Sequence, residues 1–147
     1  MYQRILVATD GSRLAARGVR EAIRLARALG ARLTGVCIVA PSPARYGEHS
    51  YYAAGLTEAD YRKYSEEPAR KALAALERGA RDARVRCTTR MVREAQPWRG
   101  ILRAARAARC QLIVMGSHGR GAVGGLILGS ETVRVLAHSK IPVIVVR

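Results

Sequence analysis

The stretch QLIVMGSHGRGAVGGLILGSE, residues 111–131, decides the fold of this chain. It opens with a short apolar run that ends at Gly116, continues through a polar, glycine-rich segment, and meets a helical pattern at Glu131. This order predicts a strand, a loop and the N-terminus of a helix. Glycines let several backbone N–H groups approach one anion, and the helix adds the positive end of its dipole. We therefore predict a phosphate-binding loop, with Ser130 at the N-cap of the helix.

Three known glycine-rich patterns share features with this loop. The P-loop pattern ends in Gly-Lys-Ser or Gly-Lys-Thr, and because neither triplet occurs, a P-loop NTPase is disfavoured. The dinucleotide pattern G-x-G-x-x-G is present over residues 119–124, but no acidic residue for a ribose follows about 20 residues later. The third pattern is Gly116-x-x-Gly119, then nine residues, then Gly129-Ser130. It is the most specific of the three because it sets four positions at the end of one predicted strand.

The rest of the chain alternates short apolar runs with amphipathic helical patterns, which predicts a parallel α/β sheet with helices on both faces. The length favours one domain, residues 1–147. Pro68 lies inside a helical pattern and predicts a break or kink near Glu67. The predicted strands are 2–9, 32–39, 85–92, 111–115 and 142–146, and the predicted helices are 12–29, 57–79, 97–108 and 130–138.

Ligands of such sheets bind beyond the carboxyl ends of the strands, where the strand order reverses. The segment from Thr9 to Ser12 follows the first strand, and the glycine-rich loop follows the fourth. In a sheet of order 3-2-1-4-5 both segments meet in one crevice. Asp10 could then accept hydrogen bonds from ribose hydroxyls, whereas by itself it would be read as a capping or Asx-turn residue.

These motifs together resemble the universal stress protein family. The similar segments are 8–12, 112–120, 129–130 and 142–146, in the family's order. The resemblance implies a Rossmann-like fold of the adenine nucleotide alpha hydrolase type, a homodimer through the last strand, and ATP binding, with AMP or ADP left open and Mg²⁺ or Mn²⁺ arriving with the phosphates. It implies a nucleotide site made of Ala8, Thr9, Asp10, Ile38, Met115, Gly116, Ser117, His118, Gly119, Arg120, Gly129, Ser130 and Glu131.

Several positions depart from the family pattern. Gly125 stands where the family often has Lys or Arg, and Arg120 could compensate for the missing charge. Glu131 replaces a common apolar residue, so its charge would repel a triphosphate. Gln111 replaces a usual Asp before the fourth strand, and we expect a structural role for it. His118 has no evident nucleophile or acid partner in the sequence, so we expect loop geometry or phosphate contact rather than acid–base catalysis.

The formal net charge of +15 raises nucleic acid or an anionic membrane surface as partners. The basic residues, however, form stripes on two helices that right-handed crossovers place on opposite sheet faces. We therefore expect solvated faces, and nucleic-acid binding is disfavoured. The stripes are Arg13, Arg17, Arg20, Arg24 and Arg27 on one helix, and Arg99, Arg103 and Arg106 on the other.

Apolar runs are far shorter than a membrane span, and no signal peptide is evident, so we expect a cytoplasmic protein. Cys37, Cys87 and Cys110 are odd in number and widely spaced, which favours buried reduced thiols over metal or disulfide chemistry. The first hypothesis for function is a nucleotide-binding stress regulator. The alternatives are a slow ATPase or nucleotidyl-transferring enzyme, and a weak, sequence-blind polyanion binder.

Overall fold

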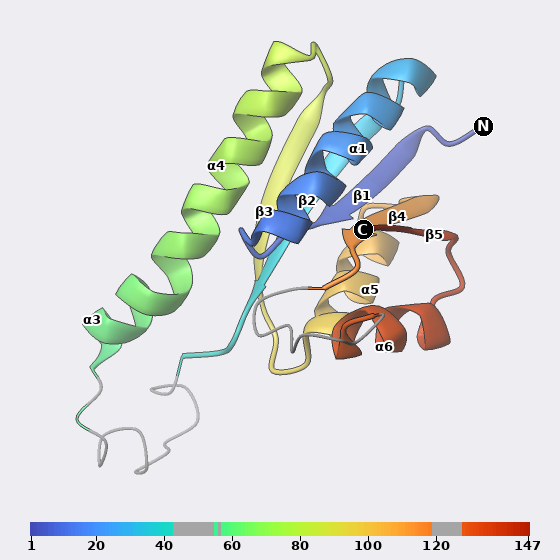
Figure 1. The fold of residues 1–147 in the computed structure, drawn as a ribbon. Coiled ribbons are helices and arrows are strands. Elements are labelled where there is room, and N and C mark those ends of the chain that lie inside the picture. Colours follow the sequence, from blue (N-terminus) through green and yellow to red (C-terminus); the bar gives the residue numbers. More distant parts are fainter. Residues whose placement is uncertain (43–54, 56, 119–127) are drawn as a thin grey trace.

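The computed structural model describes residues 1–42, 55, 57–118 and 128–147. Its sheet has five parallel strands in the order β3-β2-β1-β4-β5 (Figure 1). This confirms the predicted strand order. The strands are β1 (Arg4–Ala8), β2 (Arg32–Val39), β3 (Cys87–Arg93), β4 (Leu112–Gly116) and β5 (Val143–Val146), and the main helices are α1 (Arg13–Leu29), α4 (Glu67–Asp82), α5 (Pro97–Ala107) and α6 (Ser130–His138).

Helices cover both faces of the sheet, as predicted (Figure 1). Successive residues of a strand point to opposite faces, so β1 supplies both cores. Ile5 and Val7 pack in a core with α1 and α4, whereas Leu6 packs with α5 and α6. Ile5, Leu6 and Val7 are all fully buried, because the sheet is covered on both sides.

Local signals account for the ends of α1. The Ser12 hydroxyl accepts a hydrogen bond from the Ala15 backbone N–H at 3.2 Å and caps the N-terminus. Gly30 follows the helix with φ +62°, a left-handed conformation that glycine adopts without strain. These ends agree with the helix predicted at residues 12–29.

The predicted break at Pro68 takes another form. The short helix α3 (Glu58–Tyr61) runs through a π-helical turn, Arg62–Glu66, directly into α4. In this turn the Glu67 N–H donates to the Arg62 carbonyl, five residues back. The helix therefore does not end near Glu67, because the wider turn accommodates a proline that has no N–H to donate.

Gln111 has the structural role that we expected. Its side-chain oxygen accepts hydrogen bonds from the backbone N–H of Gln3, at 2.7 Å, and of Arg4, at 3.3 Å. It thus joins the start of β4 to the start of β1. The strand predicted at residues 85–92 begins two residues later, at Cys87, and ends one residue later, at Arg93.

Candidate functional site

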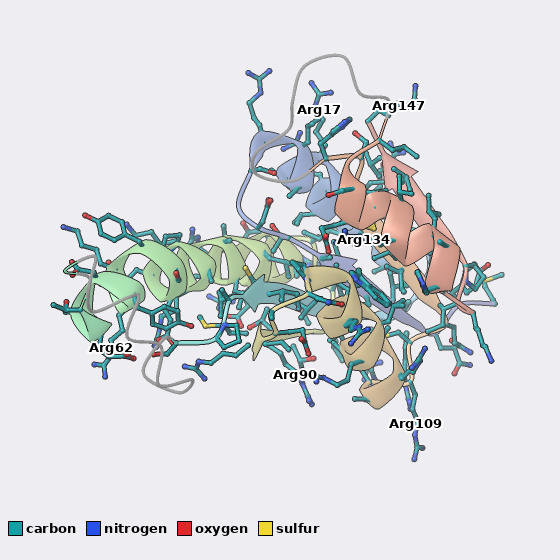
Figure 2. The ribbon with its side chains drawn as sticks, turned by 90° about the horizontal axis from the view of Figure 1, so that it is seen from below. Arg17, Arg62, Arg90, Arg109, Arg134 and Arg147 are labelled. Atoms are coloured by element: carbon teal, nitrogen blue, oxygen red, sulfur yellow. The ribbon has the colours of Figure 1, made fainter. Side chains whose placement is uncertain are left out.

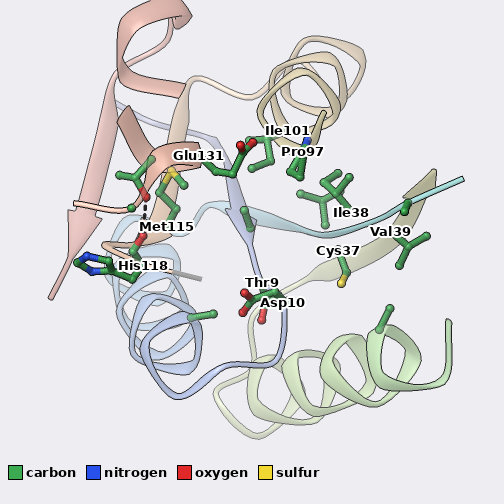
Figure 3. Close-up of a pocket in the computed structure, with 18 of the residues that line it drawn as sticks. Thr9, Asp10, Cys37, Ile38, Val39, Pro97, Ile101, Met115, His118 and Glu131 are labelled. Atoms are coloured by element: carbon green, nitrogen blue, oxygen red, sulfur yellow. Dashed lines mark hydrogen bonds between the residues drawn. The ribbon is translucent and has the colours of Figure 1, made fainter. Parts of the chain in front are cut away.

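A cavity of about 530 Å³ opens at the edge of the sheet where the strands end (Figure 3). This volume lies within the usual range for small-molecule sites, about 300–1,000 Å³. The segment after β1 and the two ends of the glycine-rich stretch contribute to its wall, although they are distant in sequence. The structure therefore brings together most of the predicted residues: Ala8, Thr9, Asp10, Ile38, Met115, Gly116, His118, Gly129, Ser130 and Glu131 all line this cavity.

One predicted residue, Ser117, is placed differently. Ser117 is buried and does not appear among the residues that line the cavity. Its backbone N–H donates to the Val146 carbonyl at 2.7 Å, so it ties β4 to β5. Gly119 and Arg120 lie outside the described residues.

The segment after β1 is held by its own polar side chains. The Thr9 N–H donates to the Val36 carbonyl at 2.9 Å and continues the pairing with β2. The Asp10 carboxylate accepts a hydrogen bond from the Ser12 N–H at 2.9 Å, which is an Asx turn. This turn keeps the carboxyl group at the cavity wall, so the capping role of Asp10 and a ligand role are compatible.

The other side of the cavity is built where β4 ends and α6 begins. The Gly129 N–H donates to the Ser117 carbonyl at 2.8 Å, and the Thr132 hydroxyl lies 3.2 Å from the carbonyls of both Gly116 and Ser117. Gly129, not Ser130, is the N-cap, and Ser130 is the first residue of the helix. The predicted N-cap is thus wrong by one residue, because the extended backbone (φ −69°, ψ 153°) already ends at Gly129.

His118 lies at the junction between these two elements. Its Nδ1 is 3.2 Å from the Ser117 hydroxyl, and the residue borders the cavity. A Cβ on Gly129 would come within 3.3 Å of the His118 Cα, so the two backbones pass closely. This packing fits the expected role in loop geometry.

Part of the cavity wall was not predicted from the sequence. Tyr64 and Ser65 reach it from the π-helical turn, and Cys37 reaches it from β2. Tyr64 is 64% exposed, so it borders the mouth of the cavity. No local pattern signals these residues, because their position depends on how α4 packs against β2. The remaining wall residues that sequence reasoning missed are Ala15, Val36, Val39, Ala40, Ala69, Pro97, Ile101 and Thr132.

Charge is distributed unevenly between the cavity and the outer surface. Of the cavity-lining residues that the structure describes, Asp10 and Glu131 are carboxylates and none is Lys or Arg. Among the described arginines, Arg17, Arg90 and Arg109 point outward on different sides of the molecule (Figure 2). The stripes predicted on the helices now called α1 and α5 lie on opposite faces of the sheet, which favours a diffuse positive field over one binding groove.

The described part of the chain also bears on metal binding, thiol chemistry and membrane insertion. Its His, Cys, Asp and Glu side chains form no group of three or more that could hold a metal ion. None of the three cysteines forms a disulfide; Cys37 and Cys110 are buried and Cys87 is half-buried. Burial raises the pKa of the Cys87 thiol to about 11. Among the described helices, none is both long and apolar enough to cross a bilayer.

Comparison with known proteins agrees with this architecture. The universal stress protein family matches residues 1–147. A universal stress protein of Thermus aquaticus, from the QAH/OAS sulfhydrylase 3' region, is 36% identical over 147 residues, covering 100% of both chains. Some structural neighbours bind adenine nucleotides. A universal stress protein in complex with cAMP has a TM-score of 0.73 at 27% identity, covering 99% of this chain and 97% of that one.

A second complex shows the same fold at lower identity. The universal stress protein of Archaeoglobus fulgidus in complex with dAMP has a TM-score of 0.70 at 19% identity, covering 99% of this chain and 98% of that one. Because the family match spans all 147 residues and the five-stranded sheet has the predicted order, this chain belongs to the universal stress protein family.

Proposed function

We propose that this chain binds an adenine nucleotide in the cavity at the ends of β1 and β4, and acts as a stress-response regulator that reports nucleotide state. The observation that carries the proposal is the convergence of Asp10, Gly116 and Gly129 on one cavity of ligand size. The related structure that contains cAMP supports an adenine nucleotide as the ligand class.

Each part of a nucleotide has a matching group in the cavity wall. Asp10 offers a carboxylate to the ribose hydroxyls, and carboxylates are strong hydrogen-bond acceptors. Ile38 offers its backbone edge and an apolar side chain to the adenine ring. The N-terminus of α6, with Gly129 and Ser130 at the wall, offers backbone N–H groups to a phosphate. Mg²⁺ or Mn²⁺ would accompany the phosphates, because both prefer oxygen ligands.

The last strand supports a homodimer as the working form. β5 lies at one end of the sheet order, beside β4. Its residues are apolar, and Ile144 is 37% exposed. An apolar edge strand offers backbone hydrogen bonds and hydrophobic contact to a second copy of itself.

Native mass spectrometry of the freshly purified full chain tests the proposal, since it reports copurifying nucleotide and subunit number together. Isothermal titration calorimetry with cAMP, AMP, ADP and ATP then measures affinity. We expect at least one of these ligands to bind with one site per chain. Absence of binding by all four would overturn the proposal, and Mg²⁺-dependent ATP turnover near or above ~1 per second would identify an enzyme instead.

A further inference from the structure

The Glu131 carboxylate lies between the N-termini of two helices. It is the second residue of α6, where a negative charge interacts favourably with the helix dipole. Its Oε2 accepts a hydrogen bond from the Trp98 backbone N–H, in the first turn of α5, at 2.8 Å. Its Oε1 is 3.0 Å from the Arg134 guanidinium, one helical turn further along α6.

The N-terminus of α5 is therefore already occupied by an anion of the protein itself. Pro97 has no N–H, the Trp98 N–H is bonded to Glu131, and the Arg99 N–H donates to the Gln96 carbonyl at 3.0 Å. A helix N-terminus beside a nucleotide cavity would otherwise attract phosphate oxygens. Figure 3 shows the Glu131 side chain close to Pro97, at the wall of the cavity.

A phosphate at the N-terminus of α6 would lie near this fixed negative charge. The Glu131 side chain is 32% exposed, so water screens the charge only in part. Arg134 shares the charge through an ion pair, but its own side chain is 55% exposed and does not line the cavity. The Glu131 carboxylate thus repels each further negative charge that a ligand's phosphates bring to this part of the cavity wall.

We infer that Glu131 determines ligand specificity by charge, so that the site prefers adenine nucleotides with a single phosphate over ADP and ATP. This inference rests on the proposed nucleotide function of the cavity. The structural reason is that the Glu131 carboxylate occupies the N-terminus of α5 and repels further negative charge at the N-terminus of α6. At separations of several Å in a partly hydrated site, such repulsion weakens binding by about two- to threefold for each nearby ligand charge.

The test is calorimetric titration of the full chain with cAMP, AMP, ADP and ATP, without divalent cations and at constant ionic strength. Glu131→Gln removes the charge but keeps an oxygen that can accept from the Trp98 N–H, so α5 stays capped. We expect the variant to bind ATP at least about tenfold more tightly, and cAMP only about two- to threefold more tightly. Wild-type affinity should fall from the monophosphates to ATP.

Glu21→Gln is the matched control. Glu21 pairs with Arg24 in α1 at the same helical spacing as Glu131 with Arg134, at 3.0 Å, and it does not line the cavity. This control changes the net charge equally and should shift the four affinities by the same small factor. The double variant Glu131→Gln with Arg134→Gln should keep the improved ratio of ATP to cAMP affinity, which shows that the released arginine is not the cause.

An unchanged ratio of ATP to cAMP affinity in Glu131→Gln would overturn the inference. An equal increase in affinity for all four ligands would also overturn it, since it would indicate a general effect of net charge and not discrimination by phosphate number. If neither wild type nor variant bound any of the four nucleotides, the proposed function would fail instead. Thermal unfolding of each variant confirms that the compared proteins are folded.

Discussion

A Cβ atom on Gly18 would lie 3.0 Å from the backbone nitrogen of Gly116, so the backbones of α1 and β4 approach each other without an intervening side chain. The approach is equally close from the other element, because a Cβ on Gly116 would lie 2.8 Å from the Leu14 carbonyl oxygen. Gly116 also lines the cavity. One residue therefore serves the packing of a helix and the shape of the proposed site.

Gly116→Ala should lower the free energy of unfolding by about 1–3 kcal/mol, the usual cost of overpacking. The new methyl group meets backbone atoms of α1, which cannot move aside independently. Urea denaturation measures the change. Gly79→Ala is the control. Its methyl group would meet only the end of the Ile23 side chain, at 3.1 Å, and alanine has a higher helix propensity than glycine. The free energy of unfolding of this variant should therefore change little. Equal stability of both variants would contradict the close packing.

Asp10→Ala should weaken nucleotide binding by about 1–3 kcal/mol, the scale of a lost charged hydrogen bond. Ser12→Ala is the control, because it removes the N-cap of α1, bonded to the Ala15 N–H, and should cost about 1 kcal/mol of stability without changing affinity. Calorimetric titration and thermal unfolding separate the two effects. If Asp10→Ala bound as tightly as wild type, the residue would have only its Asx-turn role.

Glu66 should make stability depend on acid pH. The hydrogen bond from Arg93, and then that from Arg70, lowers the pKa of this buried carboxyl group. Because the folded pKa is depressed, the stabilisation is present above the unfolded pKa of about 4.5 and is lost as pH falls through the folded value. Glu66→Gln should therefore flatten the fall in unfolding free energy between about pH 5 and pH 3.

The exposed neighbour Glu67 provides the comparison for that experiment. Glu67→Gln should retain the acid dependence of the wild type, measured by urea unfolding at each pH. If Glu66→Gln and wild type lost stability in parallel, the ion pairs of Glu66 with Arg93 in β3 and Arg70 in α4 would not be the source of the acid dependence.

Ile144→Lys should convert the proposed dimer to a monomer, because it places a charge on the apolar edge strand β5. Light scattering after size-exclusion chromatography measures the mass. Thr88→Lys introduces the same side chain at an exposed position of β3, the opposite edge of the sheet, and should leave the dimer intact. A wild-type protein that runs as a monomer would refute the dimer directly.

Much of the site was accessible from sequence because its signals are local. Gly30 ends α1, and the apolar run before Gly116 forms a buried strand, as their patterns indicate. The segments around Asp10 and Gly129 could be placed in one crevice because parallel strands end at the same edge of a sheet. The N-cap was misplaced by one residue, since Gly129 and Ser130 are both good capping residues and only the backbone dihedral angles distinguish them.

The sequence by itself determined the order of strands and helices, the two segments that line the cavity, and the family of the protein. Only the tertiary structure showed that Tyr64 reaches the cavity from a π-helical turn, and that Glu131 closes the N-terminus of α5 through Trp98. Hydrophobic period and turn chemistry are properties of neighbouring residues, and can be read along the chain. A contact between residues 33 positions apart depends on how two helices pack on one sheet face, and no local pattern encodes that geometry.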